Sequence, residues 1–345
     1  MITTTLRQAP AGFNRNLHGL RGLLALGVVV GHCGITDISS VSVWFFFVLS
    51  GYLLAKVYAG GMRPGQLGPY AVRRAARLVP LYAVVLVAIA LVPGWVYDAL
   101  LTAHSAAKFE AVAASFVQHL TFTRGNIHFW TLSQEALGYA LIAALLLLRA
   151  RLGAGRFVIL CIVIAVLSEW PALTIPMPSD DGVRPFYALH FALGVAAAQV
   201  PADGTPKRWA SAIALALLAA VLVASFFASA IKQAFQVPHW HVVIPAQSWG
   251  LIGALIILGL GHGTDVLGRF GFLGTISYGT YMFHFLVLLV VASMASSYDP
   301  YLIFLEVAAV TFALAWLSYR YIEAPCIAWA HRVTRRRAPE VAAAN

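Results

Sequence analysis

The segment RGLLALGVVVGH, residues 21–32, is a run of apolar residues with an ionisable side chain at each end. In a helix, Arg21 and His32 are ~16 Å apart along the axis, and they point from the same face because their separation corresponds to about three whole turns. His18, three residues before Arg21, falls on the same stripe. A polar stripe on an otherwise apolar helix predicts a buried function for these side chains.

The whole chain shares this apolar character. Of its 345 residues, 61% are hydrophobic and 10% are charged, and the mean hydropathy is +0.81. A soluble domain contains about 25% charged residues. We therefore expect an all-α integral membrane protein, a polytopic helical bundle that forms a single domain over residues 1–345. The three cysteines (Cys33, Cys161 and Cys326) show neither a disulfide framework nor metal-ligand spacing, and no metal is expected.

Ten stretches are long and apolar enough to be predicted as spans of about 20 residues each. They are 18–35, 41–58, 78–96, 130–148, 157–175, 184–200, 209–230, 242–261, 272–295 and 301–322. Segment 109–123 is too short and polar to span, and is predicted to be a re-entrant or surface helix.

Charge distinguishes the two sides of the predicted bundle. Basic residues gather in the loops 59–77, 149–156 and 201–208 and in a short basic tail, 323–345, whereas the alternate loops hold mostly acidic residues. The positive-inside rule therefore predicts that both termini are cytoplasmic. The same rule explains the formal net charge of +10 without a nucleic-acid partner.

Charged side chains inside predicted spans are candidate functional residues, because charge is costly in lipid. The segment YAVRRAARLVPLY, residues 70–82, places Arg74 and Arg77 on one helix face at the cytoplasmic end of the third span. Guanidinium groups bind phosphates through paired hydrogen bonds, so this pair predicts a site for a cytosolic polyanion. Anchoring in the lipid headgroups is the alternative for these two residues and for Arg21.

The fourth predicted span carries a carboxylate. In HFWTLSQEALGYA, residues 128–140, Glu135 lies inside an apolar helix and must be paired, protonated or directed into a cavity. It enters the membrane from the same outer side that His32 approaches, so we expect Glu135 to orient that imidazole and balance its charge. Packing is the alternative for His32, and Trp130 suits either a substrate site or the aromatic belt.

Three further motifs add candidates. In FFFVLSGYL, residues 45–53, a small Ser-Gly pair allows another helix or an acyl chain to approach closely. SYGTYMFHF, residues 277–285, provides Tyr281 and His284 as candidate substrate-binding residues, and SYRYIEAP, residues 318–325, provides Glu323. Pairing of Glu323 with Arg320 is the alternative, and Pro325 is expected to end the helix.

In this order, HGLRG, the Arg21–His32 pair, FFFVLSGYL, RRAAR, WTLSQE, SYGTYMFH and YIEAP resemble the integral membrane acyltransferases called acyltransferase family 3. The similarity runs from residue 18 to residue 325. It implies transfer of an acyl group, usually acetyl from cytosolic acetyl-CoA, to a carbohydrate hydroxyl at the outer face of a bacterial inner membrane. Acceptors in the family include lipopolysaccharide, other surface polysaccharides and lipid-linked oligosaccharides.

The resemblance also implies roles for single residues. His32 becomes the catalytic histidine, and Arg21, Arg74 and Arg77 become CoA-binding residues. His32 either removes the acceptor's proton or carries the acyl group covalently, and both routes stay open. Many members of the family carry an added periplasmic hydrolase-like domain, and we expect none within these 345 residues. We therefore expect either a separate periplasmic partner protein or direct use of the acceptor.

A proton-coupled transporter is the main alternative from another functional class. Buried His, Arg and Glu side chains among ten spans would also suit the export of a small anion or sugar. Such folds often show internal repeats or paired broken helices, and the sequence shows neither signal. The sequence therefore favours the acyltransferase.

Overall fold

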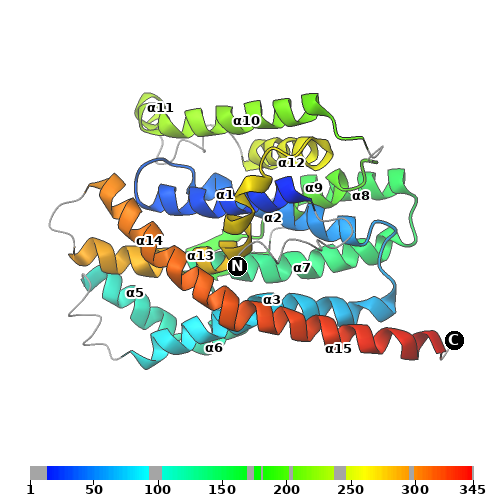
Figure 1. Ribbon diagram of the computed structural model, residues 1–345, viewed down its shortest axis with the longest axis horizontal. Helices are drawn as coiled ribbons and strands as arrows, with labels where there is room; N and C mark the ends of the chain where they lie inside the picture. Colours follow the sequence, from blue (N-terminus) through cyan, green and yellow to red (C-terminus); the bar gives the residue numbers. More distant parts are fainter. Residues whose placement is uncertain are drawn as a thin grey trace.

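The computed structural model describes residues 14–92, 103–168, 175–179, 182–201, 205–236, 246–294 and 299–343. These residues form a bundle of α-helices with one two-stranded hairpin (Figure 1). The helices are α1 (Arg15–His32), α2 (Ser39–Val57), α3 (Leu67–Leu91), α5 (Ala103–Ala114), α6 (Phe116–Leu120), α7 (Trp130–Arg149), α8 (Ala154–Leu167), α9 (Ala188–Ala197), α10 (Arg208–Phe226), α11 (Ala228–Phe235), α12 (Ala246–His262), α13 (Gly271–Met294), α14 (Pro300–Ser318) and α15 (Ala324–Ala343). The shorter elements are η1 (Pro64–Gln66), η2 (Ile127–Phe129), η5 (Gly268–Phe270), η6 (Tyr319–Glu323), β1 (Pro176–Ser179) and β2 (Gly182–Pro185).

Each of the ten predicted spans contains a helix, which confirms the all-α membrane fold. Within the part of the chain that the structure describes, six helical segments are long and apolar enough to cross a membrane: Ser39–Val57, Pro64–Leu91, Ile127–Arg149, Arg208–Phe226, Gly268–Met294 and Pro300–Arg335. The other predicted spans correspond to α1 and to the shorter apolar helices α8, α9 and α12. The count of ten crossings stays a prediction. Segment 109–123 forms parts of two short helices, α5 and α6, and no long span.

Three predicted boundaries are wrong. The sixth span is predicted from residue 184, but β2 pairs antiparallel with β1 there and α9 begins at Ala188. Pro176 and Pro185 pair with each other at the open end of the hairpin, and prolines at strand termini suit a short edge hairpin better than a helix. The loop predicted over 59–77 ends early because Pro64 opens η1 and α3 follows from Leu67, so the RRAAR arginines lie on α3 itself.

The third correction concerns Pro325, which does not end the last predicted span. The chain passes from α14 through η6, a π-helical turn, directly into α15 (Figure 1). Pro325 is the second residue of α15 and follows the π-turn directly; it cannot donate a backbone hydrogen bond, and the helix changes its hydrogen-bonding pattern there instead of ending. Most of the predicted tail, 323–345, is therefore the helix α15, which extends toward the C-terminus marked in Figure 1.

Helix α1 packs mainly against α13 and α2, and α2 packs against α9 (Figure 1). Glycines bring these backbones close together. A methyl group on Gly22 would collide with the α13 backbone at Gly274, and one on Gly51 or Gly194 would collide with the backbone across the α2–α9 contact. Small residues at helix contacts are the usual means of tight packing in membranes. In the FFFVLSGYL motif, Gly51 therefore serves close helix packing, whereas its neighbour Ser50 lines a cavity.

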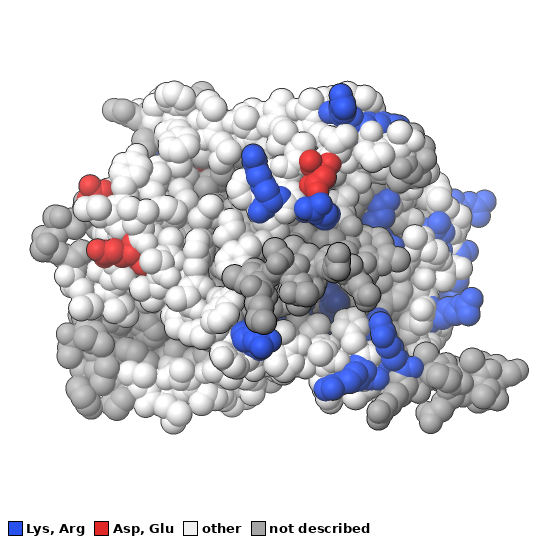
Figure 2. Space-filling model, viewed as in Figure 1, with Lys and Arg blue, Asp and Glu red and all other residues white. Residues whose placement is uncertain are grey.

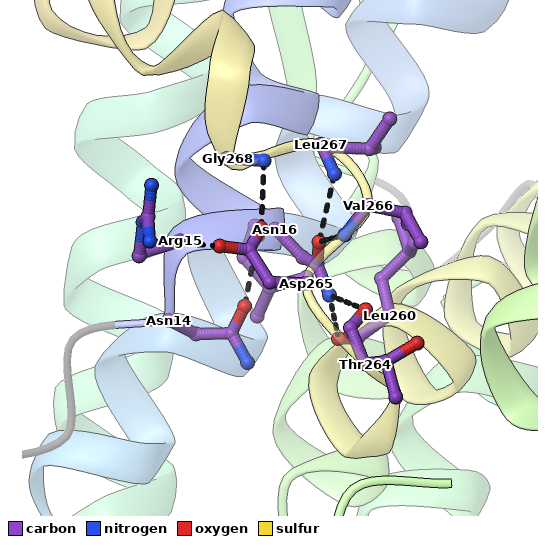
Figure 3. Close-up of polar contacts among 10 residues, drawn as sticks. Asn14, Arg15, Asn16, Leu260, Thr264, Asp265, Val266, Leu267 and Gly268 are labelled. Carbon is purple, nitrogen blue, oxygen red and sulfur yellow. Dashed lines mark hydrogen bonds and ion pairs between the residues drawn. The ribbon is translucent and has the colours of Figure 1, made fainter. Parts of the chain in front are cut away.

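The first turn of α1 is fastened to the loop between α12 and α13, as Figure 3 shows. The amide of Asn16 is buried and uses all its hydrogen-bonding capacity. Its Nδ2 donates to the carbonyls of Leu260 (3.1 Å) and Thr264 (2.8 Å). Its Oδ1 accepts from the N–H groups of Val266 (2.7 Å) and Leu267 (2.9 Å). We call Asn16 and these four partners the Asn16 clamp.

Two neighbours of Asn16 make further contacts at the first turn of α1 (Figure 3). Asn14 caps α1 by accepting from the N–H of Leu17 at 3.0 Å. Arg15 forms an ion pair with Asp265 at 3.1 Å, although both side chains are well exposed to solvent. The clamp fixes the helix from which Arg21, less than two turns further on, projects.

Lysine and arginine side chains gather toward one end of the molecule. Figure 2 shows them mainly over the right-hand half of the face drawn, toward the end of α15, whereas acidic side chains are few and appear at the left end and at one place right of the centre, beside basic side chains. In Figure 1 the connections α2–α3, α7–α8 and α9–α10 lie at this same right-hand end. These are the loops predicted to be cytoplasmic, so the fold brings them to one side, as the positive-inside rule requires.

Candidate active site

A cavity of about 830 Å³ lies among helices α1, α2, α3, α7 and α13. Its lining includes the three arginines that the sequence analysis assigns to cofactor binding, Arg21 from α1 and Arg74 and Arg77 from α3. Glu135 from α7 and Tyr281 from α13 also line it. The fold therefore brings five predicted site residues to one cavity, although α1, α3, α7 and α13, which carry them, are far apart in the sequence. We call this space the arginine cavity.

The adjacent arginines of the RRAAR motif have different surroundings. Arg73 does not line the cavity, and its Nε donates to Thr334 Oγ1 of α15 at 3.0 Å. Arg74 lines the cavity, with its guanidinium carbon 5.7 Å from the centre of the Tyr139 ring. Among the described residues, the buried Arg74 Nε has no hydrogen-bond partner. Leaving a buried donor unused costs ~1–3 kcal/mol, so Arg74 has a donor available for a ligand.

Glu135 lies with the arginines. Its carboxylate accepts a hydrogen bond from the hydroxyl of Tyr139, one helical turn further along α7. Arg74 and Arg77 are close enough to act on it electrostatically. The expected pairing of Glu135 with His32 is not found, because the hydrogen-bond partner of His32 is His284. The cause is geometric, since Glu135 projects into the arginine cavity, whose lining does not include His32.

His32 is the last residue of α1 and lies against α13. Its Nδ1 is 2.8 Å from Nε2 of His284, and the two rings are parallel, with centroids 5.1 Å apart. The ring of Phe285 meets His32 edge-on at 5.4 Å, and the ring of His128 meets His284 at 5.2 Å. We call His32, His128 and His284 the histidine cluster. Among the described residues, no three His, Cys, Asp or Glu side chains are grouped to hold a metal ion.

Tyr281 joins the arginine cavity to the histidine cluster. It lines the cavity, and its backbone carbonyl lies 2.7 Å from Nδ1 of His284. Its hydroxyl donates to the carbonyl of His128 at 2.8 Å and accepts from Thr131 Oγ1 at 2.7 Å. Of the predicted substrate-binding residues, His284 is thus brought beside His32, and Tyr281 beside His284.

The other two predicted substrate-binding residues lie elsewhere. Neither Trp130 nor Glu323 lines the arginine cavity. Trp130 packs near Tyr187, with ring centroids 6.0 Å apart. Glu323 is buried in η6 and accepts a hydrogen bond from Ser318 Oγ at 3.2 Å, whereas the expected pairing with Arg320 is not found between these described side chains.

Sequence reasoning missed the parts played by Tyr139 and His128. Tyr139 follows Glu135 by four residues, and this spacing on a helix was a usable signal for a contact. His128 lies in η2, just before α7 begins, and no residue at a helical spacing in the sequence indicates its contacts. Its Nε2 donates to the Met282 carbonyl at 3.1 Å, and its buried Nδ1 has no partner among the described residues.

Comparison with known proteins identifies the family of the chain. A family described as an acyltransferase domain matches residues 14–320. A protein of Komagataeibacter xylinus described as a membrane-bound transacylase, BcsY, is 28% identical over 298 residues, covering 80% of this chain and 73% of its own. The peptidoglycan O-acetyltransferase OatA of Listeria monocytogenes is 24% identical over 351 residues, covering 90% of this chain.

The chain spans 55% of the length of OatA, and no solved structure matches it. The family match covers most of the sequence and includes the helices that carry Arg21, His32, Arg74, Arg77 and Glu135. The chain therefore belongs to acyltransferase family 3, a family of integral membrane acyltransferases.

Proposed function

We propose that this protein transfers an acyl group, acetyl in the simplest case, from cytosolic acyl-CoA to a carbohydrate hydroxyl at the outer face of a bacterial inner membrane. The observation that carries the proposal is the convergence of Arg21, Arg74 and Arg77 on one cavity. Three guanidinium groups around a membrane cavity suit a ligand with several phosphates. Coenzyme A is such a ligand, and its thioester lies at the end of a long arm.

The depth of the site supports the same assignment. The phosphates bind at Arg21, Arg74 and Arg77, and the pantetheine arm extends past Tyr281 toward His32, which is ~16 Å further along α1 than Arg21. Binding and chemistry are thereby separated along the membrane normal. The acceptor then meets the thioester at the end of the bundle opposite the basic loops.

In the direct route, the chemistry needs one base and no covalent enzyme intermediate. The acceptor hydroxyl loses its proton to His32 while its oxygen bonds to the thioester carbonyl carbon. The carbon–sulfur bond then breaks, and the departing CoA sulfur takes the proton from the His32 imidazolium. The products are an O-acyl ester and free CoA thiol, so His32 returns to its starting state.

The names of the relatives support a polymeric carbohydrate acceptor. OatA is a peptidoglycan O-acetyltransferase and BcsY is described as a transacylase. For this chain, we propose a cell-surface glycan, either a polysaccharide, a lipopolysaccharide or a lipid-linked oligosaccharide. Mass spectrometry of surface glycans from wild-type and deletion cells tests this, and the expected result is loss of one acyl mass increment in the deletion strain.

Sidedness is tested with the purified protein in liposomes. Acetyl-CoA labelled in its acetyl group should bind only from the side that carries the basic loops. Reporter fusions after residue 337 should behave as cytoplasmic, and those within 178–183 as external. Failure of the wild-type protein to bind any acyl-CoA would remove the donor from the proposal.

A further inference from the structure

The hydrogen bonds of the histidine cluster define which ring nitrogens carry protons. His284 Nδ1 lies 2.7 Å from the carbonyl oxygen of Tyr281, and a carbonyl can only accept a hydrogen bond. The Nδ1 of His284 must therefore carry the proton. A neutral imidazole has one N–H, so His284 Nε2 is left as an acceptor.

His284 stays neutral because its surroundings offer no counter-charge. Its side chain is fully buried, and its ring neighbours are His32, His128, Tyr281 and Phe285. None of these carries a negative charge, and a buried unpaired cation is strongly unfavourable. Glu135, which the sequence predicts to balance the charge of His32, bonds to Tyr139 instead.

The tautomer of His32 follows from that of His284. His32 Nδ1 lies 2.8 Å from His284 Nε2, and since His284 Nε2 accepts, His32 Nδ1 must donate. His32 Nε2 then has no proton and presents a free lone pair. The carbonyl of Tyr281, His284 and His32 form a chain of hydrogen bonds in which every donor has a defined acceptor.

The geometry points to His284 as the positioning residue for His32, a role distinct from the substrate binding that its motif suggested. This role rests on the proposed function: His284 holds His32 in the tautomer whose Nε2 takes the proton of the acceptor hydroxyl. It thus occupies the place that a carboxylate fills beside many catalytic histidines. Tyr281 supports the chain through its carbonyl and at the same time lines the arginine cavity.

The position of His32 in its helix favours the charge that this step creates. His32 lies in the last turn of α1, where the helix dipole presents its negative end. A cation there gains ~0.3–1 kcal/mol, or somewhat more in a partly buried position. The hydrogen bond from His32 Nδ1 to the neutral His284 also becomes stronger when His32 is positively charged, because hydrogen bonds from charged donors are stronger.

Two amide substitutions separate the two hydrogen bonds of His284. In His284→Asn the shorter amide can still donate to the Tyr281 carbonyl but cannot reach His32. In His284→Gln the longer amide can place its oxygen where Nε2 lies. We expect His284→Asn to lower kcat ~10²-fold or more, with the KM for acetyl-CoA within about twofold, and His284→Gln to recover much of that loss.

A matched control exists in α12. His262 also bonds a carbonyl of its own helix, with Nδ1 3.0 Å from the oxygen of Leu258, but its Nε2 has no partner among the described residues. His262→Asn should therefore leave kcat and KM unchanged. Equal losses of kcat in His262→Asn and His284→Asn would show a general effect on folding and would overturn the positioning role.

Nitrogen-15 NMR of histidine-labelled wild-type protein in nanodiscs tests the tautomer without any activity. Signals of His32 are identified by their loss in His32→Gln. We expect a protonated Nδ1 and an unprotonated Nε2 for His32, and a mixture of tautomers in His284→Asn. A protonated Nε2 on His32 in the wild type would overturn the inference. The expected tautomer in a protein that transfers no acyl group would support the hydrogen-bond chain and overturn the proposed function instead.

Discussion

The two ends of α1 are held by opposite kinds of interaction. At its N-terminus, the amide of Asn16 satisfies four backbone groups, and Arg74, which lines the same cavity as Asn14 and Arg21, keeps its Nε available. At its C-terminus, His32 lies among rings, with one hydrogen bond to His284. The N-terminal end combines the Asn16 clamp with arginine side chains that line a cavity, which suits binding of a polyanion. The second offers a single oriented base in apolar surroundings, which suits proton transfer.

The comparison is tested most strongly by replacing one residue at each end. His32→Ala should lower acyl transfer ~10²–10⁴-fold, the usual contribution of a general base, and leave acetyl-CoA binding intact. Arg21→Ala should weaken acetyl-CoA binding first, with transfer recovering at high donor concentration. Calorimetric titration and transfer kinetics on both variants measure the split.

The contradictory result is equally specific. If folded His32→Ala protein transfers acyl groups at the wild-type rate, the histidine cluster has no part in the chemistry. If both variants lose binding and transfer together, α1 acts as one unit, and the division by depth fails.

The next largest effect is expected at α3. Replacing Arg74 and Arg77 with Ala should raise the Kd for acetyl-CoA, by about 10- to 150-fold for each residue, because a charged hydrogen bond contributes ~1.5–3 kcal/mol. Lysine replacements should restore only part of this affinity, since an ammonium group cannot reproduce the planar guanidinium fork. Equilibrium binding of labelled acetyl-CoA measures the change.

The chain supplies its own control for this experiment. Arg73 adjoins Arg74 but donates to Thr334 and does not line the arginine cavity. Arg73→Ala should leave the Kd within about twofold. A loss in Arg73→Ala equal to that in the double variant would mean that the arginines act through general charge at the membrane surface.

These two ends also show what the sequence could predict. Helical periodicity was sufficient to place Arg21 and His32 on one helix face and Arg74 beside Arg77, because both relations lie within one helix. The family resemblance placed the motifs in order along the chain. Contacts between helices were beyond this reasoning, since they depend on the rotation and depth at which each helix packs.

Glu135 illustrates that limit. Its depth suggested a partnership with His32, but depth does not fix the face of α7 from which it projects. The structure turns it toward Tyr139 and the arginines, and gives His32 a second histidine instead. Likewise, no local signal distinguished Arg73 from Arg74, because their partners, α15 and the cavity, are formed by distant parts of the chain.

Glu135→Gln is expected to have a smaller effect, and it decides to which end Glu135 belongs. The amide keeps the shape and can still accept from Tyr139, but the negative charge beside Arg74 and Arg77 is lost. Repulsion of the CoA phosphates then falls, so we expect severalfold tighter acetyl-CoA binding with kcat changed by less than tenfold. A large loss of kcat with an unchanged Kd for acetyl-CoA would instead show that Glu135 acts on His32.

The smallest effect on activity, and the clearest on stability, is expected at the Asn16 clamp. Asn16→Ala leaves two buried carbonyls and two N–H groups without their partner, and each unsatisfied buried group costs ~1–3 kcal/mol. Arg15→Ala removes only an exposed ion pair, which contributes ~0–1 kcal/mol. Thermal unfolding in detergent should therefore show a Tm lower by several degrees for Asn16→Ala and nearly unchanged for Arg15→Ala. Since the clamp positions Arg21 and not His32, Asn16→Ala should also weaken acetyl-CoA binding while kcat at saturating donor stays near that of the wild type. Equal destabilisation by the two substitutions would show that charge, rather than the saturated amide, holds this end of α1.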